Sequence, residues 1–107
     1  GGVEPIVPGC APLRPTVVAG TLTGIEIEPN HPGTRCGNHY VLAVKETASG
    51  KAMKLTLYDL AKAPYAKLEA MLRKPVEIDT LGSSVVGIRL AGETTAALAG
   101  LSAVKPC

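Results

Sequence analysis

Two histidines and a cysteine lie close together in the sequence, in a stretch whose composition is typical of a loop. His31, Cys36 and His39 fall within nine residues, and with Cys107 they would supply the nitrogen and sulfur ligands of a tetrahedral zinc site. Their spacing matches no standard zinc finger, and a cysteine that forms a disulfide cannot bind a metal. We therefore expect no metal and no other cofactor, and we keep a metal or redox role through Cys36 as an alternative.

Two pairs of carboxylates have the spacing of neighbours on one side of a strand. Glu26 and Glu28 are two residues apart, and so are Glu77 and Asp79. Paired carboxylates perform acid–base catalysis only where burial separates their pKa values, whereas polar residues at this spacing normally form the water-facing side of a strand. The sequence marks no oxyanion hole for a Cys–His nucleophile and contains no phosphate-binding Gly-rich motif. We expect that the protein is not an enzyme.

The composition also argues against a nucleic-acid ligand. The formal net charge is only +2, and Lys and Arg are interleaved with Asp and Glu instead of forming the basic stripe that binds phosphates. The chain has three Tyr and no Phe or Trp. Tyr40 shares its parity with Leu42 and Val44 and is predicted to point inward, which leaves Tyr58 as the aromatic side chain of an outer face. One such ring is a weak platform for stacking bases.

The three cysteines indicate an oxidising compartment. Cys10, Cys36 and Cys107 are the disulfide candidates, and they permit three alternative single bridges among which the sequence does not choose. Each bridge would close a long loop and add about 3–5 kcal/mol of stability in the chain-entropy model. No apolar run approaches the roughly 20 residues that cross a bilayer as a helix. We expect an exported protein, periplasmic or extracellular, without a transmembrane segment.

Hydrophobic patterning then predicts the elements that position these residues. Residues 1–15 contain four prolines and are predicted to form an extended arm, followed by a single domain over 16–107. A helical spacing of apolar residues predicts a helix over 64–73. The Ala-rich tail is ambiguous, with a possible helical turn over 94–98 and an extended end over 102–107. Alternation of apolar and polar residues predicts five strands, at 16–28, 40–45, 52–58, 76–81 and 85–91.

Two details of these strands can be predicted from parity. In the first strand the apolar positions change parity at Gly24, which indicates a β-bulge or a sharp bend. In the fifth strand we expect Val86, Ile88 and Leu90 to point inward. With so few aromatic residues, the core must be built from Val, Leu, Ile, Ala and Met side chains.

The order of three strands, one helix and two strands resembles the OB-fold, a five-stranded Greek-key β-barrel. Three local features support the resemblance: the Gly-centred bend in Gly20-Thr21-Leu22-Thr23-Gly24, the step from the helix into Lys74-Pro75-Val76-Glu77-Ile78, and a hairpin over Gly82. The segment from Cys10 to Leu22, followed by Tyr40-Val41-Leu42, is similar to small secreted bacterial OB-like domains of unknown function. The B subunits of AB₅ toxins share the same strand order.

This resemblance implies a mostly β, OB-like barrel with one helix between the third and fourth strands. We expect a non-enzymatic exported module that uses the surface of the barrel to bind a protein partner or a small ligand. One alternative is a subunit of a homo-oligomeric ring, as in AB₅ B subunits, and the other is the metal or redox role of the Cys36 loop. The candidate binding residues are Arg35, His39, Lys54, Thr56 and Tyr58.

Overall fold

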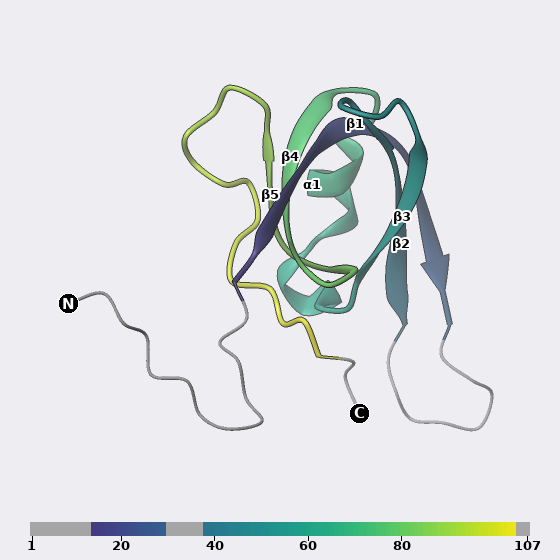
Figure 1. Cartoon of the computed structure of the whole chain (residues 1–107). Coiled ribbons are helices and arrows are strands. Elements are labelled where there is room, and N and C mark those ends of the chain that lie inside the picture. The colour runs from purple at the N-terminus through teal and green to yellow at the C-terminus, as the bar shows by residue number, and fades with distance from the viewer. Residues whose placement is uncertain (1–13, 30–37, 105–107) are drawn as a thin grey trace, which may run out of the picture.

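The chain folds into a closed five-stranded β-barrel with one short helix (Figure 1). The computed structural model describes residues 14–29 and 38–104. The strands lie in the order β1-β2-β3-β5-β4, and β4 pairs back onto β1. This confirms the predicted fold class, a mostly β, OB-like barrel with its helix between the third and fourth strands. Along the chain the elements are β1 (Thr16–Glu28), β2 (His39–Glu46), β3 (Ala52–Leu57), a 3₁₀ turn η1 (Leu60–Lys62), α1 (Tyr65–Glu69), β4 (Pro75–Leu81) and β5 (Ser84–Leu90).

Strand β1 closes the barrel because it is long enough to pair with two neighbours. Its first half pairs with β4 and its second half with β2, both antiparallel. The register against β2 shifts between Leu22 and Gly24, which confirms the predicted irregularity near Gly24. Thr23 is the extra residue, and its hydroxyl donates to the Ala43 carbonyl at 3.1 Å. A bulge of this kind bends the strand and lets it cross from one side of the barrel to the other.

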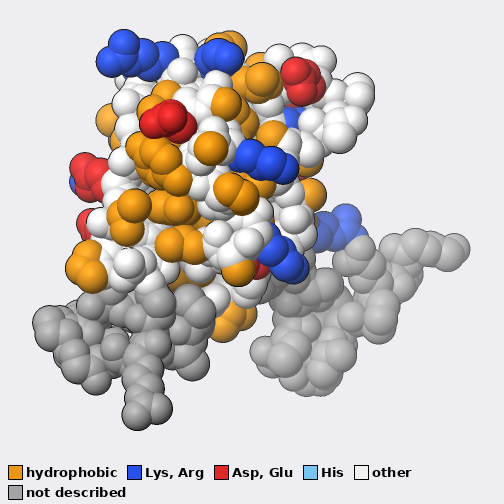
Figure 2. All heavy atoms as spheres, turned by 180° about the vertical axis from the view of Figure 1, so that it is seen from behind, with side chains coloured by type: hydrophobic (Ala, Val, Ile, Leu, Met, Phe, Trp, Pro, Cys, Tyr) orange, Lys and Arg blue, Asp and Glu red, His pale blue; other side chains and the backbone are white. Residues whose placement is uncertain are grey.

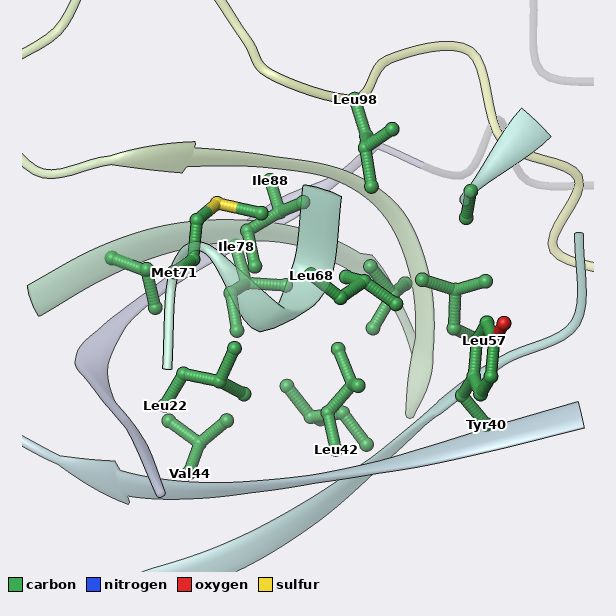
Figure 3. Packing of buried hydrophobic residues seen from close by; sticks show 14 of the residues in the cluster. Leu22, Tyr40, Leu42, Val44, Leu57, Leu68, Met71, Ile78, Ile88 and Leu98 are labelled. Atoms are coloured by element: carbon green, nitrogen blue, oxygen red, sulfur yellow. The ribbon is translucent and has the colours of Figure 1, made fainter. Parts of the chain in front are cut away.

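The barrel interior is filled by branched aliphatic side chains. Leu22 and Leu42 come from the sheet, Leu68 from α1, and Ile78 and Ile88 from the last hairpin; all five are fully buried. Figure 3 shows Leu68 in the middle of this cluster, between the side chains of the opposing strands. The prediction that Tyr40 points inward is confirmed, because it is buried at the edge of the core, where it lies beside Leu57.

The inward-facing residues of β5 differ from those predicted. Val85 is fully buried while Val86 is only half-buried, and Leu90 is also half-buried. The cause is a second irregularity, because Thr80 pairs with Val85 and the preceding Asp79 pairs with Gly87. Val86 is the extra residue, so the parity of the strand changes between Val85 and Ile88. The prediction was therefore wrong for Val86 and correct for Ile88 and for Leu90, which pairs with buried Val76 and packs against the core.

The helix is shorter than predicted and ends at Glu69 instead of Arg73. The chain continues in tight turns, and the backbone of Arg73 adopts a left-handed conformation, with φ of 64°. Its N–H donates to the carbonyl of Leu22 in β1 at 2.6 Å, and the N–H of Leu22 donates to the carbonyl of Lys74 at 3.3 Å. These bonds to β1 take the place of the hydrogen bonds that would continue the helix. The apolar spacing over 64–73 therefore marks a buried face, but only part of its backbone is helical.

The tail after β5 packs onto the barrel and forms no helix over 94–98. Leu98 makes an isolated antiparallel bridge with Ile88, and the N–H of Leu101 donates to the carbonyl of Val86 at 3.0 Å. Both leucines are buried. The tail therefore runs along β5 on the side away from β4. The predicted arm over 1–15 lies almost wholly outside the described residues, which begin at Arg14.

Candidate functional site

The outer side of the β1–β2–β3 sheet brings together most of the candidate binding residues. Along each strand the side chains alternate between the buried core and this face, because successive side chains point to opposite sides of a sheet. We use "outer face" for nine residues that lie opposite the core set: Glu26, Glu28, His39, Val41, Ala43, Lys45, Lys54, Thr56 and Tyr58.

The strand register fixes how these side chains are arranged. Val41 lies at the centre, paired with Glu26 on β1 and with Thr56 on β3. The next step along β2 toward its start is His39, which pairs with Glu28. Directly opposite residues on one face are close enough for their side chains to touch, so each step along β2 defines a row of side chains across the sheet.

The row at the start of β2 contains the most specific geometry of the face. The His39 Nε2 atom lies 3.5 Å from a carboxylate oxygen of Glu28, and the His39 ring centroid is 5.7 Å from that of Tyr58. The imidazole is thus held between a carboxylate and a phenol ring, and only 17% of its side chain is exposed. Within the described part of the chain, its buried Nδ1 atom has no hydrogen-bond partner.

A buried nitrogen without a partner is costly, since a polar atom removed from water loses free energy unless it is hydrogen-bonded. Neutral imidazole presents one donor and one acceptor. If Nε2 carries the proton toward Glu28, the Nδ1 atom of His39 is left as an acceptor. Because this atom is buried, the groups that the row presents to a ligand are the exposed Glu28 carboxylate and the half-buried Tyr58 ring.

The two ends of the outer face carry opposite charges. Lys45 and Lys54 are exposed and occupy the end near the β2–β3 turn. Glu26 and Glu28 are exposed and occupy the other end, on β1. The prediction that these two carboxylates face solvent is confirmed. Val41 and Ala43 on β2 lie between these charges, with Val41 beside Glu26 and Ala43 beside Lys54, so the carboxylates and the lysines occupy opposite corners of the face.

The structure thus brings four of the five predicted residues onto one face but not into one cluster. His39 and Tyr58 touch, and Thr56 lies one row away. Lys54 is four residues before Tyr58 along the chain, roughly 13 Å at the rise of a strand. Arg35 lies outside the described residues, as do His31 and the disulfide candidates Cys10, Cys36 and Cys107.

Sequence reasoning missed the role of Glu28. It was assigned to a water-facing pair with Glu26, whereas its closest functional partner is His39 on the next strand. The signal that could have found it is the β1–β2 hairpin itself. Glu28 and His39 flank the loop-like stretch on either side, and antiparallel pairing then places them opposite each other.

The second carboxylate pair is neutralised by an arginine. On the outer side of the β4–β5 hairpin, the Nε atom of Arg89 donates to Glu77 Oε1 at 3.2 Å, and its Nη1 atom lies 3.3 Å from Asp79 Oδ2. The prediction that Glu77 and Asp79 lie on an outer side is correct, but both are half-buried and ion-paired. The guanidinium makes charge-assisted hydrogen bonds to both carboxylates, so this cluster is suited to a structural role.

The described residues contain no group of three or more His, Cys, Asp or Glu side chains that could hold a metal ion. Of the four possible zinc ligands in the sequence, His39 is described, whereas His31, Cys36 and Cys107 fall outside residues 14–29 and 38–104. The metal or redox alternative for the Cys36 loop therefore stays untested by the structure. In the same part of the chain, no helix has the length and hydrophobicity required to cross a membrane.

The surface also carries exposed hydrophobic side chains. Figure 2 shows hydrophobic side chains gathered on the back of the molecule, with basic and acidic side chains around them. Tyr65 is 40% exposed, and its ring lies 6.2 Å from that of buried Tyr40. Ile27, paired with Tyr40 across β1 and β2, is 54% exposed. Among the described large hydrophobic residues, Val17 and Val104 are the other two that are exposed.

No protein-family model, no curated protein and no solved structure matches this chain.

Proposed function

We propose that this protein is a non-enzymatic binding module that docks a protein partner on the outer face of β1, β2 and β3. The observation that carries the proposal is the row formed by Glu28, His39 and Tyr58. The imidazole, whose buried Nδ1 atom has no partner among the described residues, lies at the margin of a face whose central strand carries the short side chains of Val41 and Ala43. Polar groups at the margin of such a face give orientation, while short central side chains permit close approach of another surface.

The strand order supports a relation to the OB-fold and, more narrowly, to small exported bacterial OB-like domains. We propose on this basis that the protein is exported to the periplasm or the extracellular space. Because the three cysteines lie outside the described residues, their pairing requires a chemical test. Thiol titration under denaturing conditions should find one reactive thiol if one disulfide is present, and three if there is none.

Site-specific photocrosslinking in the native host tests the docking surface. A benzoyl-phenylalanine placed at Thr56, at the centre of the outer face, should give a discrete crosslinked species, and the substitution Tyr58→Ala should reduce its yield. The same probe at Thr94, an exposed residue of the tail, is the matched control. The proposal fails if the two positions give the same products, or if only the Thr94 probe crosslinks.

A ring of identical subunits is the second candidate. The exposed side chains of Ile27 and Tyr65 favour it, since exposed apolar surface often marks a subunit contact. Light scattering on the purified chain separates the two candidates, because a ring predicts a mass of several chains that does not depend on Thr56 or Tyr58.

A further inference from the structure

We propose that the outer face of β1–β3 recognises a second copy of the same chain and forms a two-fold symmetric, face-to-face dimer. This inference rests on the proposed function, because it takes the outer face as the docking surface and names the occupant. Its basis is the segregation of charge on that face. Lys45 and Lys54 lie at one end, and Glu26 and Glu28 lie at the other.

A face with this arrangement complements itself in one orientation. Consider a two-fold axis that lies in the plane of the contact, passes near Val41 and Ala43, and crosses the strands obliquely, perpendicular to the line from the carboxylates of β1 to the lysines of β2 and β3. Rotation about this axis brings the lysine corner of each copy over the glutamate corner of the other. An axis parallel to β2 would instead set Lys45 against its own copy. The charge pattern therefore selects one symmetric arrangement, in which each contact occurs twice.

The side chains at the centre permit such packing. Val41, Ala43 and Thr56 are short and already half-buried in the single chain. Two sheets pack about 10 Å apart when their side chains fit together, and short central residues allow this approach without clashes. The long lysine side chains lie away from this axis, where their ammonium groups can reach the opposing carboxylates while remaining partly hydrated.

The same physics sets the strength of the dimer. Ion pairs at the rim of an interface are weak individually and are screened by salt, with a Debye length of about 10 Å at 0.1 M. We therefore expect association to be strongest at low ionic strength. The charge pairs also determine orientation, because juxtaposed like charges disfavour the alternative arrangements.

A charge-swap experiment tests this dimer with purified protein. The variant Lys45→Glu/Lys54→Glu has an all-acidic outer face, and the variant Glu26→Lys/Glu28→Lys has an all-basic one. Each variant alone should dimerise at least about tenfold more weakly than the wild type. The reason is that the attraction between the lysines of one copy and the glutamates of the other becomes a repulsion between like charges. An equimolar mixture of the two should form a heterodimer, measured by sedimentation velocity at low salt.

Two further variants control the experiment. Lys67→Glu/Glu69→Lys exchanges two exposed charges on α1, away from the outer face, and should leave the dimer unchanged. Val41→Lys places a charge beside the two-fold axis, where it meets its own copy, and should abolish the wild-type dimer. Circular dichroism melts establish that each variant is folded.

The proposal is overturned if the wild type sediments as a single chain at millimolar concentration and low salt, if the acidic and basic variants do not associate on mixing, or if the assembly is a larger ring. A monomeric result leaves the proposed function intact, because crosslinking from Thr56 to a different protein would still identify the outer face as a docking surface. Crosslinking from Thr56 to a second copy would support both proposals.

Discussion

The backbone of Leu98 is paired with that of Ile88. The N–H of Ile88 donates to the Leu98 carbonyl at 2.9 Å, and the N–H of Leu98 donates to the Ile88 carbonyl at 3.1 Å. The tail is also fastened by the backbone N–H of Ser102, which donates to the Asp59 carboxylate at 2.9 Å. Satisfying the edge of β5 in this way keeps its backbone from pairing with another chain, so the tail is part of the barrel.

We predict that Leu98→Ala destabilises the protein by about 2–5 kcal/mol, the usual loss when a buried leucine is truncated. Its side chain is 4% exposed and packs in the core cluster. Urea denaturation measures the effect. Val104→Ala is the matched control, because Val104 is 74% exposed and surface substitutions stay within about 0.5 kcal/mol. A loss below about 1 kcal/mol for Leu98→Ala would show that the tail does not contribute to the barrel.

Gly20 lies where β1 closely approaches β2. A Cβ atom added there would meet the Lys45 carbonyl oxygen at 2.5 Å and the Val44 Cγ1 atom at 2.7 Å. Both are closer than non-bonded contacts allow, and the carbonyl belongs to a rigid sheet. We expect Gly20→Ala to cost at least about 1–3 kcal/mol, the usual effect of forcing extra atoms into a packed site, as measured by thermal or urea unfolding.

Gly24 supplies the control for Gly20. A Cβ atom there would meet only the Ala43 Cβ atom, at 3.6 Å, which is an ordinary contact. Glycine within a strand is less favourable than alanine by about 0.5–1 kcal/mol, so Gly24→Ala should be neutral or slightly stabilising. Equal losses at the two positions would indicate that the bulge, and not the contact with β2, determines the need for glycine.

The success of the sequence predictions follows from where polar residues interrupt the apolar ones. In β3, the polar residues Lys54 and Thr56 alternate with apolar ones, and the apolar Leu55 and Leu57 are buried, so parity alone identified the inner side. In β5, the run from Val85 to Ile88 contains no charged residue to reveal a change of side. The bulge there depends on pairing with β4, which a single strand does not encode.

The candidate site shows the same limit. His39 and Tyr58 could be predicted from their types and their positions beside strands. Their contact with each other, and that of His39 with Glu28, depends on the registers of two separate strand pairs. The placement of Lys45 and Lys54 relative to the carboxylates of β1 depends on the same registers, because the four charges lie on three different strands.

The left-handed backbone of Arg73 gives a third prediction. Its φ of 64° costs about 1 kcal/mol for a residue with a Cβ atom, whereas glycine adopts it without strain. Arg73→Gly should therefore raise stability by about 0.5–1 kcal/mol, or several degrees in the melting temperature for a domain of this size. The backbone bond to Leu22 is kept in this variant.

Lys74 provides the comparison for Arg73. It is the next residue and is also exposed, but its φ is not positive. Lys74→Gly should lower stability by a few tenths of a kcal/mol to about 1 kcal/mol, because glycine adds freedom to the unfolded chain. If Arg73→Gly and Lys74→Gly both lower the stability, the side chain of Arg73 stabilises the protein by more than its backbone strain destabilises it.

The ion-paired Arg89 gives the last prediction. Its guanidinium joins Glu77 and Asp79, and 22% of its side chain is exposed. Arg89→Met keeps much of the apolar contact of the side chain but leaves two half-buried carboxylates side by side. We expect a loss of about 1–2 kcal/mol at neutral pH, reduced in 1 M NaCl because salt screens the repulsion between the carboxylates.

Arg89→Lys should retain only part of the stability, since an ammonium group cannot bond both carboxylates with the fixed geometry of a guanidinium. Combining Arg89→Met with Glu77→Gln and Asp79→Asn should recover most of the loss, because no unpaired charge remains. If the triple variant is as unstable as Arg89→Met alone, the arginine acts through packing on the β4–β5 hairpin and not through its charge. Urea unfolding of the three variants at low and high salt separates these two roles.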